Sequence, residues 1–213
     1  MEKVTSQIKE WSEDFGKEYT ARNPLIFDEM DMLYLKQKGI TRSSLNSEFI
    51  GQMDRFIRIF EVGANVGTQL QGLQKLGFSN LYGIELQANA VELAKTRTKN
   101  INLIQGTAFN IPFKNGFFDL VFTSGLLIHI SPDDIGEALD EIFRCSNQYI
   151  WGCEYYNNNY VSVPYRGKND LLWKADFAGL FLDRFKELEL VKEKRIKYLN
   201  NENLDTMFLL KKT

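Results

Sequence analysis

Residues 59–70 read Ile59-Phe60-Glu61-Val62-Gly63-Ala64-Asn65-Val66-Gly67-Thr68-Gln69-Leu70, and this stretch decides the fold. The residues at 56–60 are rich in β-branched and aromatic side chains, as buried strands are, and a helix-compatible segment opens at Thr68. The glycines between them can adopt positive φ, which lets a ligand lie directly on the backbone. The first turn of a helix adds unpaired N–H groups, which favour negative charge. The stretch therefore predicts a strand, a tight turn and a helix start that hold a nucleotide-like ligand.

The spacing of the glycines narrows the kind of ligand. A dinucleotide-binding fingerprint, G-x-G-x-x-G, needs a glycine two residues after Gly63, but this position holds Asn65 and the next glycine is Gly67. The G-K-[ST] ending of a phosphate-binding P-loop is missing from the sequence as well. The pattern E-x-G-x-x-x-G instead resembles the first motif of class I S-adenosylmethionine-dependent methyltransferases. A strand-to-helix turn that binds nothing is the alternative, and at this point it stays open.

The composition excludes several classes of protein. The chain has 213 residues, with 26 Lys and Arg against 28 Asp and Glu, so its net charge of −2 gives no basic footprint for nucleic acid. Its two cysteines, Cys145 and Cys153, match neither a metal-ligand pattern nor a disulfide framework. The residues at 1–15 are too polar for a signal peptide, and no apolar run is long enough to span a membrane. We expect a single cytoplasmic domain with no metal, nucleic acid or membrane partner.

Apolar residues at helical spacing predict that residues 1–53 form a helical extension ahead of a catalytic core at residues 54–213. The densest part of the extension crowds aromatic side chains and one arginine around Gly16. One interpretation is a helix that packs its aromatics on the core. The other is a lid formed by residues 11–23, which closes over the cofactor and brings Tyr19 and Arg22 near its carboxylate.

Two further βα units follow the opening strand. A short strand at 81–84 ends at Glu85, and an acid at this place can accept two hydrogen bonds from ribose hydroxyls. A second crossover helix at 87–98 leads to a third strand at 102–105. In many methyltransferases an aspartate that meets the adenine amino group follows that strand, but this chain has Thr107 there. We therefore expect the backbone of Thr107 and Ala108 to contact adenine.

The second half of the chain predicts the rest of an α/β sheet. Apolar residues at 117–124 are typical of a central parallel strand, which ends at Ser124. Because ligands of such sheets sit beyond the carboxyl ends of the strands, Glu61, Glu85, Thr107 and Ser124 should converge. The remaining elements are a helix from Ser131 to about Arg144, a strand at 149–155, a long connection at 156–169, a helix at 176–185 and two strands at 188–198 and 205–210. This order predicts a Rossmann-like, mostly parallel seven-stranded sheet whose last strand is antiparallel, as in class I methyltransferases.

A more particular resemblance runs the length of the chain. The segments that carry it include Phe15-Gly16, Glu18-Tyr19, Arg22-Asn23, Leu127-Ile128-His129-Ile130, Glu154-Tyr155-Tyr156 and Val163-Pro164-Tyr165-Arg166-Gly167. In these segments the chain is similar to the methyltransferases associated with pseudaminic acid biosynthesis. The resemblance implies S-adenosylmethionine as cofactor and a nonulosonic or nucleotide-activated sugar as acceptor, but it assigns no catalytic roles.

Two residues are candidates for a catalytic role. His129 is the only histidine, and an imidazole is the usual first candidate for a general base, although in this position it could instead support the loop or line the pocket. Glu154 ends the fifth strand and could take a proton from an acceptor hydroxyl, or be a surface acid. In the loop that follows, Arg166 suits a carboxylate or phosphate because a guanidinium donates two parallel hydrogen bonds. The expected acceptor contacts are Tyr155, Tyr156, Tyr165 and Arg166.

The leading hypothesis is a methyltransferase that transfers the methyl group of S-adenosylmethionine to an oxygen, or else a nitrogen, of a small polar acceptor. A nicotinamide-dependent oxidoreductase is disfavoured by Asn65 and by the closing pair of strands. A catalytically inactive methyltransferase fold is disfavoured by the intact Gly63, Gly67 and Glu85. The expected cofactor contacts are Trp11, Tyr19, Arg22, Glu61, Gly63, Ala64, Asn65, Gly67, Glu85, Leu86, Thr107, Ala108 and Ser124.

Overall fold

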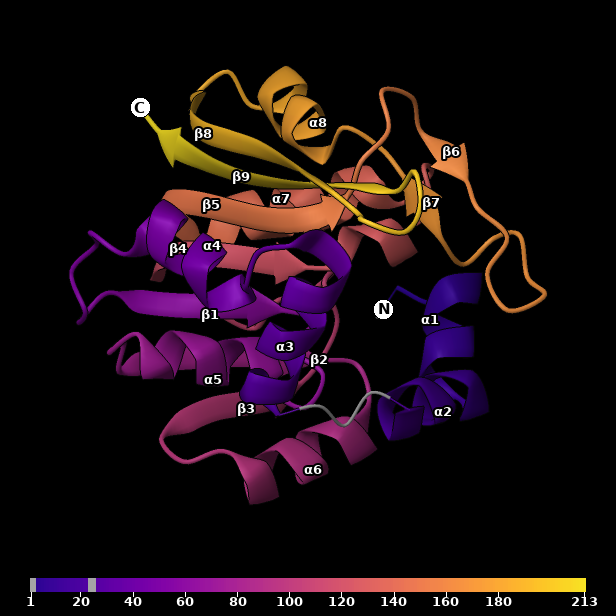
Figure 1. Ribbon diagram of the computed structural model, residues 1–213, viewed down its shortest axis with the longest axis horizontal. Coiled ribbons are helices and arrows are strands. Elements are labelled where there is room, and N and C mark those ends of the chain that lie inside the picture. Colours follow the sequence, from indigo (N-terminus) through magenta and orange to yellow (C-terminus); the bar gives the residue numbers. More distant parts are fainter. Residues whose placement is uncertain (1–2, 23–25) are drawn as a thin grey trace.

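The centre of the molecule is a seven-stranded sheet, seen in a computed structural model that describes residues 3–22 and 26–213 (Figure 1). The strand order is β3-β2-β1-β4-β5-β9-β8. The first five strands run parallel, and β9 lies antiparallel between β5 and β8. The predicted mostly parallel sheet with an antiparallel last strand is therefore confirmed. The strand bounds are β1 Arg58–Val62, β2 Asn80–Glu85, β3 Ile101–Gln105, β4 Phe118–Ser124, β5 Ser146–Tyr155, β8 Leu188–Lys197 and β9 Leu204–Lys212.

Among the described residues, four helices precede β1, where the sequence predicted a helical extension. They are α1 Ser6–Ser12, α2 Asp14–Arg22, α3 Phe27–Lys38 and α4 Arg42–Ile50. Figure 1 shows α1 and α2 set apart from the sheet, near the loop that carries β6, whereas α3 and α4 lie against it. Asn23, the last residue of the expected lid, lies outside the described residues. Across the part of the chain that is described, no helix is long and apolar enough to cross a membrane.

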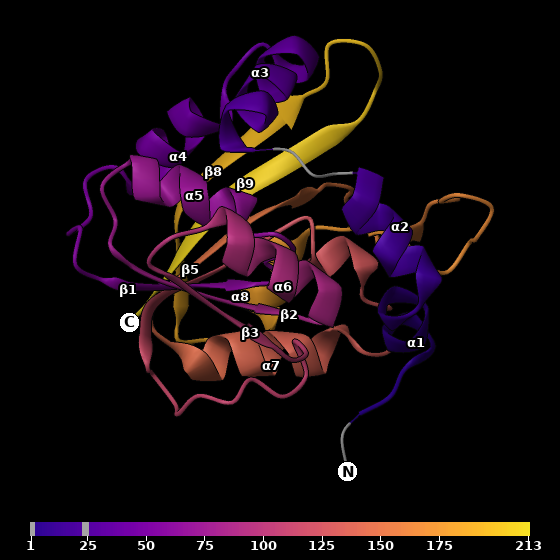
Figure 2. The same ribbon diagram turned by 90° about the horizontal axis from the view of Figure 1, so that it is seen from below.

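The two faces of the sheet are covered by separate layers of helices (Figure 2). On one face, α4, α5 Thr68–Lys75 and α6 Ala88–Arg97 pack on a cluster that includes Leu120 and Phe122 of β4. On the other face, α7 Ile135–Cys145 and α8 Phe177–Arg184 pack on a cluster that includes Val121. Because β4 is covered on both faces, its residues from Leu120 to Thr123 are all buried, as the sequence predicted for a central parallel strand.

Two element starts differ from the sequence prediction. The first strand starts at Arg58 rather than at Phe56, which is 77% exposed. The reason is local, since the backbone N–H of Phe56 donates to the carboxylate of Asp54 (2.7 Å) in a turn ahead of the strand. Likewise, α7 begins at Ile135 and not directly after Ser131. The hydroxyl of Ser131 donates to the carboxylate of Asp134 (2.7 Å), so it closes a turn instead of capping the helix.

The long connection after β5 is less irregular than its sequence indicates. Within it, β6 Val161–Ser162 pairs with β7 Trp173–Lys174 as a short antiparallel ribbon. The backbone N–H of Val163 also bonds to the carbonyl of Leu172 (2.8 Å). This ribbon holds the loop beside the carboxyl end of the sheet, where the 3-10 turn η1 Leu127–His129 follows β4.

Candidate active site

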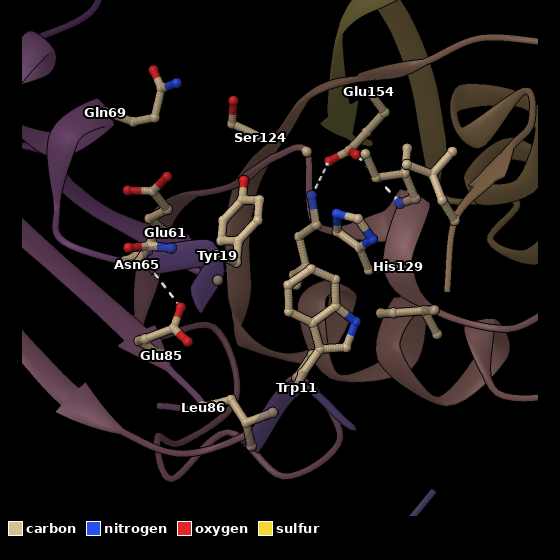
Figure 3. A pocket seen from close by; sticks show the side chains of 18 of the residues that line it. Trp11, Tyr19, Glu61, Asn65, Gln69, Glu85, Leu86, Ser124, His129 and Glu154 are labelled. Carbon is tan, nitrogen blue, oxygen red and sulfur yellow. Dashed lines mark hydrogen bonds between the residues drawn. The ribbon is translucent and has the colours of Figure 1, made fainter. Parts of the chain in front are cut away.

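A cavity of about 520 Å³ opens beyond the carboxyl ends of the parallel strands. Its wall combines residues from α1 and α2, which are called the lid helices below, from the ends of β1, β2, β4 and β5, and from the loop after β5. In Figure 3, Glu61, Asn65 and Glu85 gather on one side of Tyr19, and Trp11, His129 and Glu154 lie on the other. Sixteen of the expected residues line this cavity, namely Trp11, Tyr19, Glu61, Gly63, Ala64, Asn65, Glu85, Leu86, Thr107, Ala108, Ser124, His129, Glu154, Tyr155, Tyr165 and Arg166.

The turn after β1 has the backbone shape that the glycines predicted. Positive φ angles occur at Gly63 (78°), Asn65 (46°) and Gly67 (77°). A Cβ atom on Gly63 would lie 2.7 Å from the Cδ1 of Leu126, so only glycine fits between this turn and the loop after β4. Gly67 does not line the cavity. It is the N-cap of α5, and its expected role as a cofactor contact becomes one of shaping the turn.

Glu85 is fixed at the tip of β2 by backbone hydrogen bonds. One carboxylate oxygen accepts from the N–H of Asn65 (2.8 Å) and the other from the N–H of Gln87 (3.0 Å). Burial raises the pKa of Glu85, and these backbone donors oppose that rise. Each carboxylate oxygen has two lone pairs, so the group can still accept the two hydroxyl protons of a ribose.

Glu61, at the end of β1, is a buried acid whose Oε2 atom has no hydrogen-bond partner among residues 3–22 and 26–213. Its side chain is 1% exposed, and burial raises the pKa of this carboxyl well above its ordinary value despite the attraction of Arg42. Buried polar atoms are normally paired, so this oxygen on the cavity wall is available to a hydrogen-bond donor of a ligand. An ammonium group would satisfy it.

At the far end of this side, the wall consists of Leu86, Thr107 and Ala108. The hydroxyl oxygen of Thr107 accepts the backbone N–H of Phe109 (3.3 Å), which keeps the side chain within its own turn. The expectation that the backbone of Thr107 and Ala108 contacts adenine stays a prediction.

Glu154 is buried at the end of β5, and its side chain is hydrogen-bonded to the loop after β4. Its two carboxylate oxygens accept from the backbone N–H groups of Leu126 (3.2 Å) and Ile128 (3.4 Å). Burial raises the pKa of Glu154 to about 7, although these hydrogen bonds favour the charged form. The carboxyl thus titrates near neutrality on the cavity wall, and it is not the surface acid that the sequence left as an alternative.

His129 presents a neutral imidazole. Its Nδ1 atom lies 2.7 Å from the carbonyl oxygen of Leu171, and because a carbonyl only accepts, Nδ1 carries the proton and Nε2 keeps its lone pair. Burial lowers the pKa of His129 to about 4, so the ring is uncharged at neutral pH. Aromatic rings surround it, with the centroid of Trp11 at 4.4 Å and that of Tyr165 at 5.9 Å.

The lid helices cross the cavity and contact both of its sides. The hydroxyl of Thr20 in α2 lies 3.4 Å from Oε1 of Gln87, next to α6. On the opposite side, Glu10 of α1 forms a salt bridge with Lys168 of the loop after β5 (2.6 Å). Between these contacts, the ring of Trp11 meets Tyr19 edge to face at 5.3 Å. Trp11 and Tyr19 of these helices therefore line the cavity, which is the position that the lid interpretation requires of them.

Besides Gly67, two expected residues lie away from the cavity. Arg22 is on an exposed face of α2, where it pairs with Glu18 (3.1 Å) one turn earlier, so it does not approach a cofactor carboxylate in this structure. Tyr156 turns toward β8 instead, and the guanidinium of Arg195 lies 3.4 Å from its ring centroid. Tyr19, three residues earlier in the same helix, does line the cavity.

A polar group on the α3 side of the cavity was missed by the sequence analysis. The ammonium of Lys38 pairs with the carboxylate of Asp205 and lies over the rings of Tyr34 (3.9 Å) and Tyr198 (4.6 Å). All four side chains line the cavity. No local sequence motif indicates these four side chains, because α3 and the β8–β9 hairpin are far apart in the sequence and meet only in the fold. The one available signal was Asp205 at the start of the mostly apolar β9, because α3 carries several other charged residues besides Lys38.

The segment of residues 60–148 matches a family described as a methyltransferase domain. A demethylmenaquinone methyltransferase from Lactococcus lactis is 39% identical over 67 residues, which cover 29% of this chain and 26% of that enzyme. An uncharacterized protein from Haemophilus influenzae is 27% identical over 93 residues, which cover 41% of this chain and 37% of that protein. The matched segments thus span well under half of either curated relative.

Among solved structures, the chain is similar to the 1,6-didemethyltoxoflavin-N1-methyltransferase of Burkholderia thailandensis, crystallised with 1,6-didemethyltoxoflavin and S-adenosylhomocysteine. The TM-score is 0.70 at 13% sequence identity, and the match covers 100% of this chain and 93% of that one. A likeness at this identity shows the fold, which is the Rossmann-like fold of class I methyltransferases. Together, the matched domain and the fold support S-adenosylmethionine as the cofactor.

Proposed function

We propose that this chain is an S-adenosylmethionine-dependent methyltransferase that acts on a small polar acceptor, with residues 1–53 as a helical extension on a catalytic core at residues 54–213. The observation that carries the proposal is the buried carboxyl of Glu61, whose Oε2 atom has no partner within residues 3–22 and 26–213, beside the positive-φ turn at Gly63, with Glu85 fixed at the next strand end. A nucleoside with an amino acid attached carries ribose hydroxyls that can donate to Glu85 and an ammonium that can donate to Glu61.

In the proposed binding mode, Glu85 accepts both ribose hydroxyls, and Glu61 accepts from the ammonium of the methionine portion. Leu86 and the backbone of Thr107 and Ala108 hold the adenine ring. When bound, the cofactor supplies an electrophilic methyl group. The chain itself orients the two reactants and excludes water, with the aromatic side chains of the lid covering the cavity.

We propose that the acceptor lies on the Glu154 side of the cavity, between the lid and the loop at 156–169. Tyr155 and Tyr165 present flat rings on that side, and Arg166 is exposed at the rim next to the ring of Tyr165 (5.8 Å). Tyrosine rings suit the apolar face of a sugar, and a guanidinium suits its carboxylate or phosphate. Together with the sequence resemblance, this supports a sugar or nucleotide-activated sugar, methylated on oxygen.

The acceptor proton goes to Glu154 in this proposal. A base is most effective when its pKa lies near the working pH, and the pKa of Glu154 is about 7. His129 is the competing candidate, because its Nε2 lone pair belongs to a neutral ring on the same cavity wall. The lid keeps both groups away from bulk water, so the proton must pass to one of them or directly to a water molecule in the cavity.

Two measurements test the proposal. Isothermal titration calorimetry with S-adenosylhomocysteine and, separately, with NAD should show binding of the first and none of the second, and the reverse result would favour an oxidoreductase. Turnover of S-adenosylmethionine should then be followed with a panel of nucleotide-activated and free acidic sugars. Product S-adenosylhomocysteine that forms only with an acceptor establishes the enzyme, whereas tight binding with no turnover on any class of acceptor supports a non-catalytic binding protein.

A further inference from the structure

Arg42, at the start of α4, carries a buried charge without an ion pair. Its side chain is 0% exposed, and no carboxylate of residues 3–22 and 26–213 forms a salt bridge with it. Nε donates to the amide oxygen of Asn46 (2.8 Å), and Nη2 has no partner among the described residues. A buried cation is costly to desolvate and normally lies against an anion. The guanidinium of Arg42 therefore meets only uncharged hydrogen-bond partners among the described residues.

The remaining hydrogen bonds of Arg42 lead to the cavity wall. Its Nη1 atom donates to the hydroxyl oxygens of Tyr34 (3.1 Å) and Ser124 (3.2 Å), and both of these residues line the cavity. Because each hydroxyl accepts from the guanidinium, its own proton is free to point elsewhere. A hydroxyl that accepts from a cation is also a stronger donor, since hydrogen bonds in a chain polarise one another. The wall thus offers two strengthened donors to an anionic group.

The neighbouring charges show which part of a ligand would fit. Lys38 already has a counter-ion in Asp205, whereas Arg42 forms no salt bridge with any of the described residues. The carboxyl of Glu61 interacts electrostatically with Arg42, and its Oε2 atom has no hydrogen-bond partner among the described residues. A buried acid and a buried base that lie close together and do not pair with each other match the ammonium and carboxylate of one amino acid.

We propose that Tyr34 and Ser124, backed by Arg42, bind the carboxylate of the methionine portion of the cofactor, while Glu61 binds its ammonium. The inference rests on the proposed function. Arg42 acts through the two hydroxyls, so it is a positioning residue and does not touch the ligand. This assignment replaces Arg22, which the sequence favoured for the same carboxylate and which faces solvent.

The test compares two ligands that differ in the amino acid portion. S-adenosylhomocysteine carries it, and 5′-methylthioadenosine lacks it but keeps the nucleoside. By calorimetry, Tyr34→Phe and Ser124→Ala should each lower the affinity for S-adenosylhomocysteine by roughly 10-fold or more, because each variant loses one hydrogen bond to a charged group. Binding of 5′-methylthioadenosine should change by less than about twofold. Arg42→Lys should fall between the wild type and Arg42→Met in affinity for S-adenosylhomocysteine. Tyr149→Phe is the matched control, because Tyr149 lies near the start of β5, away from the cavity at the carboxyl end of this strand.

The outcomes separate this inference from the function on which it rests. An equal loss for both ligands, or no loss for either, in the two hydroxyl variants overturns the inference and leaves the methyltransferase proposal standing. If the wild type binds neither ligand, the proposed function fails and the inference fails with it. The hydroxyl variants keep the test decisive even if Arg42→Met does not fold, since each removes a single oxygen from the cavity wall.

Discussion

The carboxylate of Glu85 accepts the backbone N–H of Asn65 across 2.8 Å, which ties the tip of β2 to the turn that follows β1. Glu85→Ala removes this tie and the acceptor that we assign to the ribose. The affinity for S-adenosylhomocysteine should therefore fall by roughly 30- to 1000-fold, measured by calorimetry. Glu92→Ala, which removes an exposed acid paired with Lys95 on α6, is the control. Wild-type affinity in the Glu85 variant would exclude this residue from the site.

Glu154→Gln should lower turnover by roughly 100-fold while the affinity for the cofactor stays unchanged, because an amide cannot take the acceptor proton. In the wild type, turnover should rise with pH through about 7 and level off above it, as the carboxyl ionises. His129→Ala is the paired variant. If the histidine variant alone loses turnover, the two roles are reversed, and if both remain active, positioning carries the reaction.

The same carboxyl makes stability depend on pH. The pKa of Glu154 is about 7 in the folded protein against 4.5 ordinarily, so between these values the folded chain keeps a proton that the unfolded chain releases. Its contribution, on the order of 3 kcal/mol, is present below about pH 4.5 and is lost as the pH rises to about 7. Urea unfolding from pH 5 to 8 should show a weaker pH dependence in Glu154→Gln than in the wild type. Identical slopes would show that Glu154 does not titrate in this range.

Deletion of residues 1–23 should lower the affinity for S-adenosylhomocysteine by about 10-fold or more without unfolding the sheet. The physical reason is that α1 has no buried residue, so little core packing is lost with it. A point variant tests the same segment, because a Cβ atom on Gly16 would lie 1.9 Å from the backbone oxygen of Trp11 and 2.5 Å from Nε2 of Gln87, so α2 would have to shift against both α1 and Gln87. Circular dichroism should be near that of the wild type for Gly16→Ala, while calorimetry shows weaker binding. Unchanged affinity in both variants would mean that the lid does not close on the cofactor.

The buried pair of Lys38 and Asp205 should matter for stability as a unit. Lys38→Met alone leaves the aspartate, which is 4% exposed, without its partner, and the free energy of unfolding should fall by roughly 3 to 5 kcal/mol. The double variant Lys38→Met with Asp205→Leu should recover much of this loss, because neither charge is then buried. Denaturant unfolding of both single variants and the double variant measures the coupling. Simple additivity would show that the pair does not act as a unit.

The sequence predicted the features that depend on neighbouring residues. The turn at Gly63 and the acid at Glu85 follow from local backbone geometry, and both are found where the pattern indicated. By contrast, the interactions of Arg42 with Ser124 and of Lys38 with Asp205 join residues 82 and 167 positions apart. Sequence periodicity gives the order and type of the elements but not the rotation of one helix against another. For that reason the sequence predicted Arg22 of the extension at the cofactor, whereas in the structure Arg42 is the arginine of the extension that bonds to the cavity wall.

The position of β9 sets an order of events for the folding of the chain. This strand is the last along the sequence, yet it lies inside the sheet, where it pairs with β5 on one side and β8 on the other. Until Leu204–Lys212 has been synthesised, β5 is an open edge whose residues from Ile150 to Glu154 are destined to be buried. An uncovered apolar edge is a template for pairing with other chains. Nascent or truncated forms without β9 should therefore aggregate, and chaperone capture should act on the β5 edge.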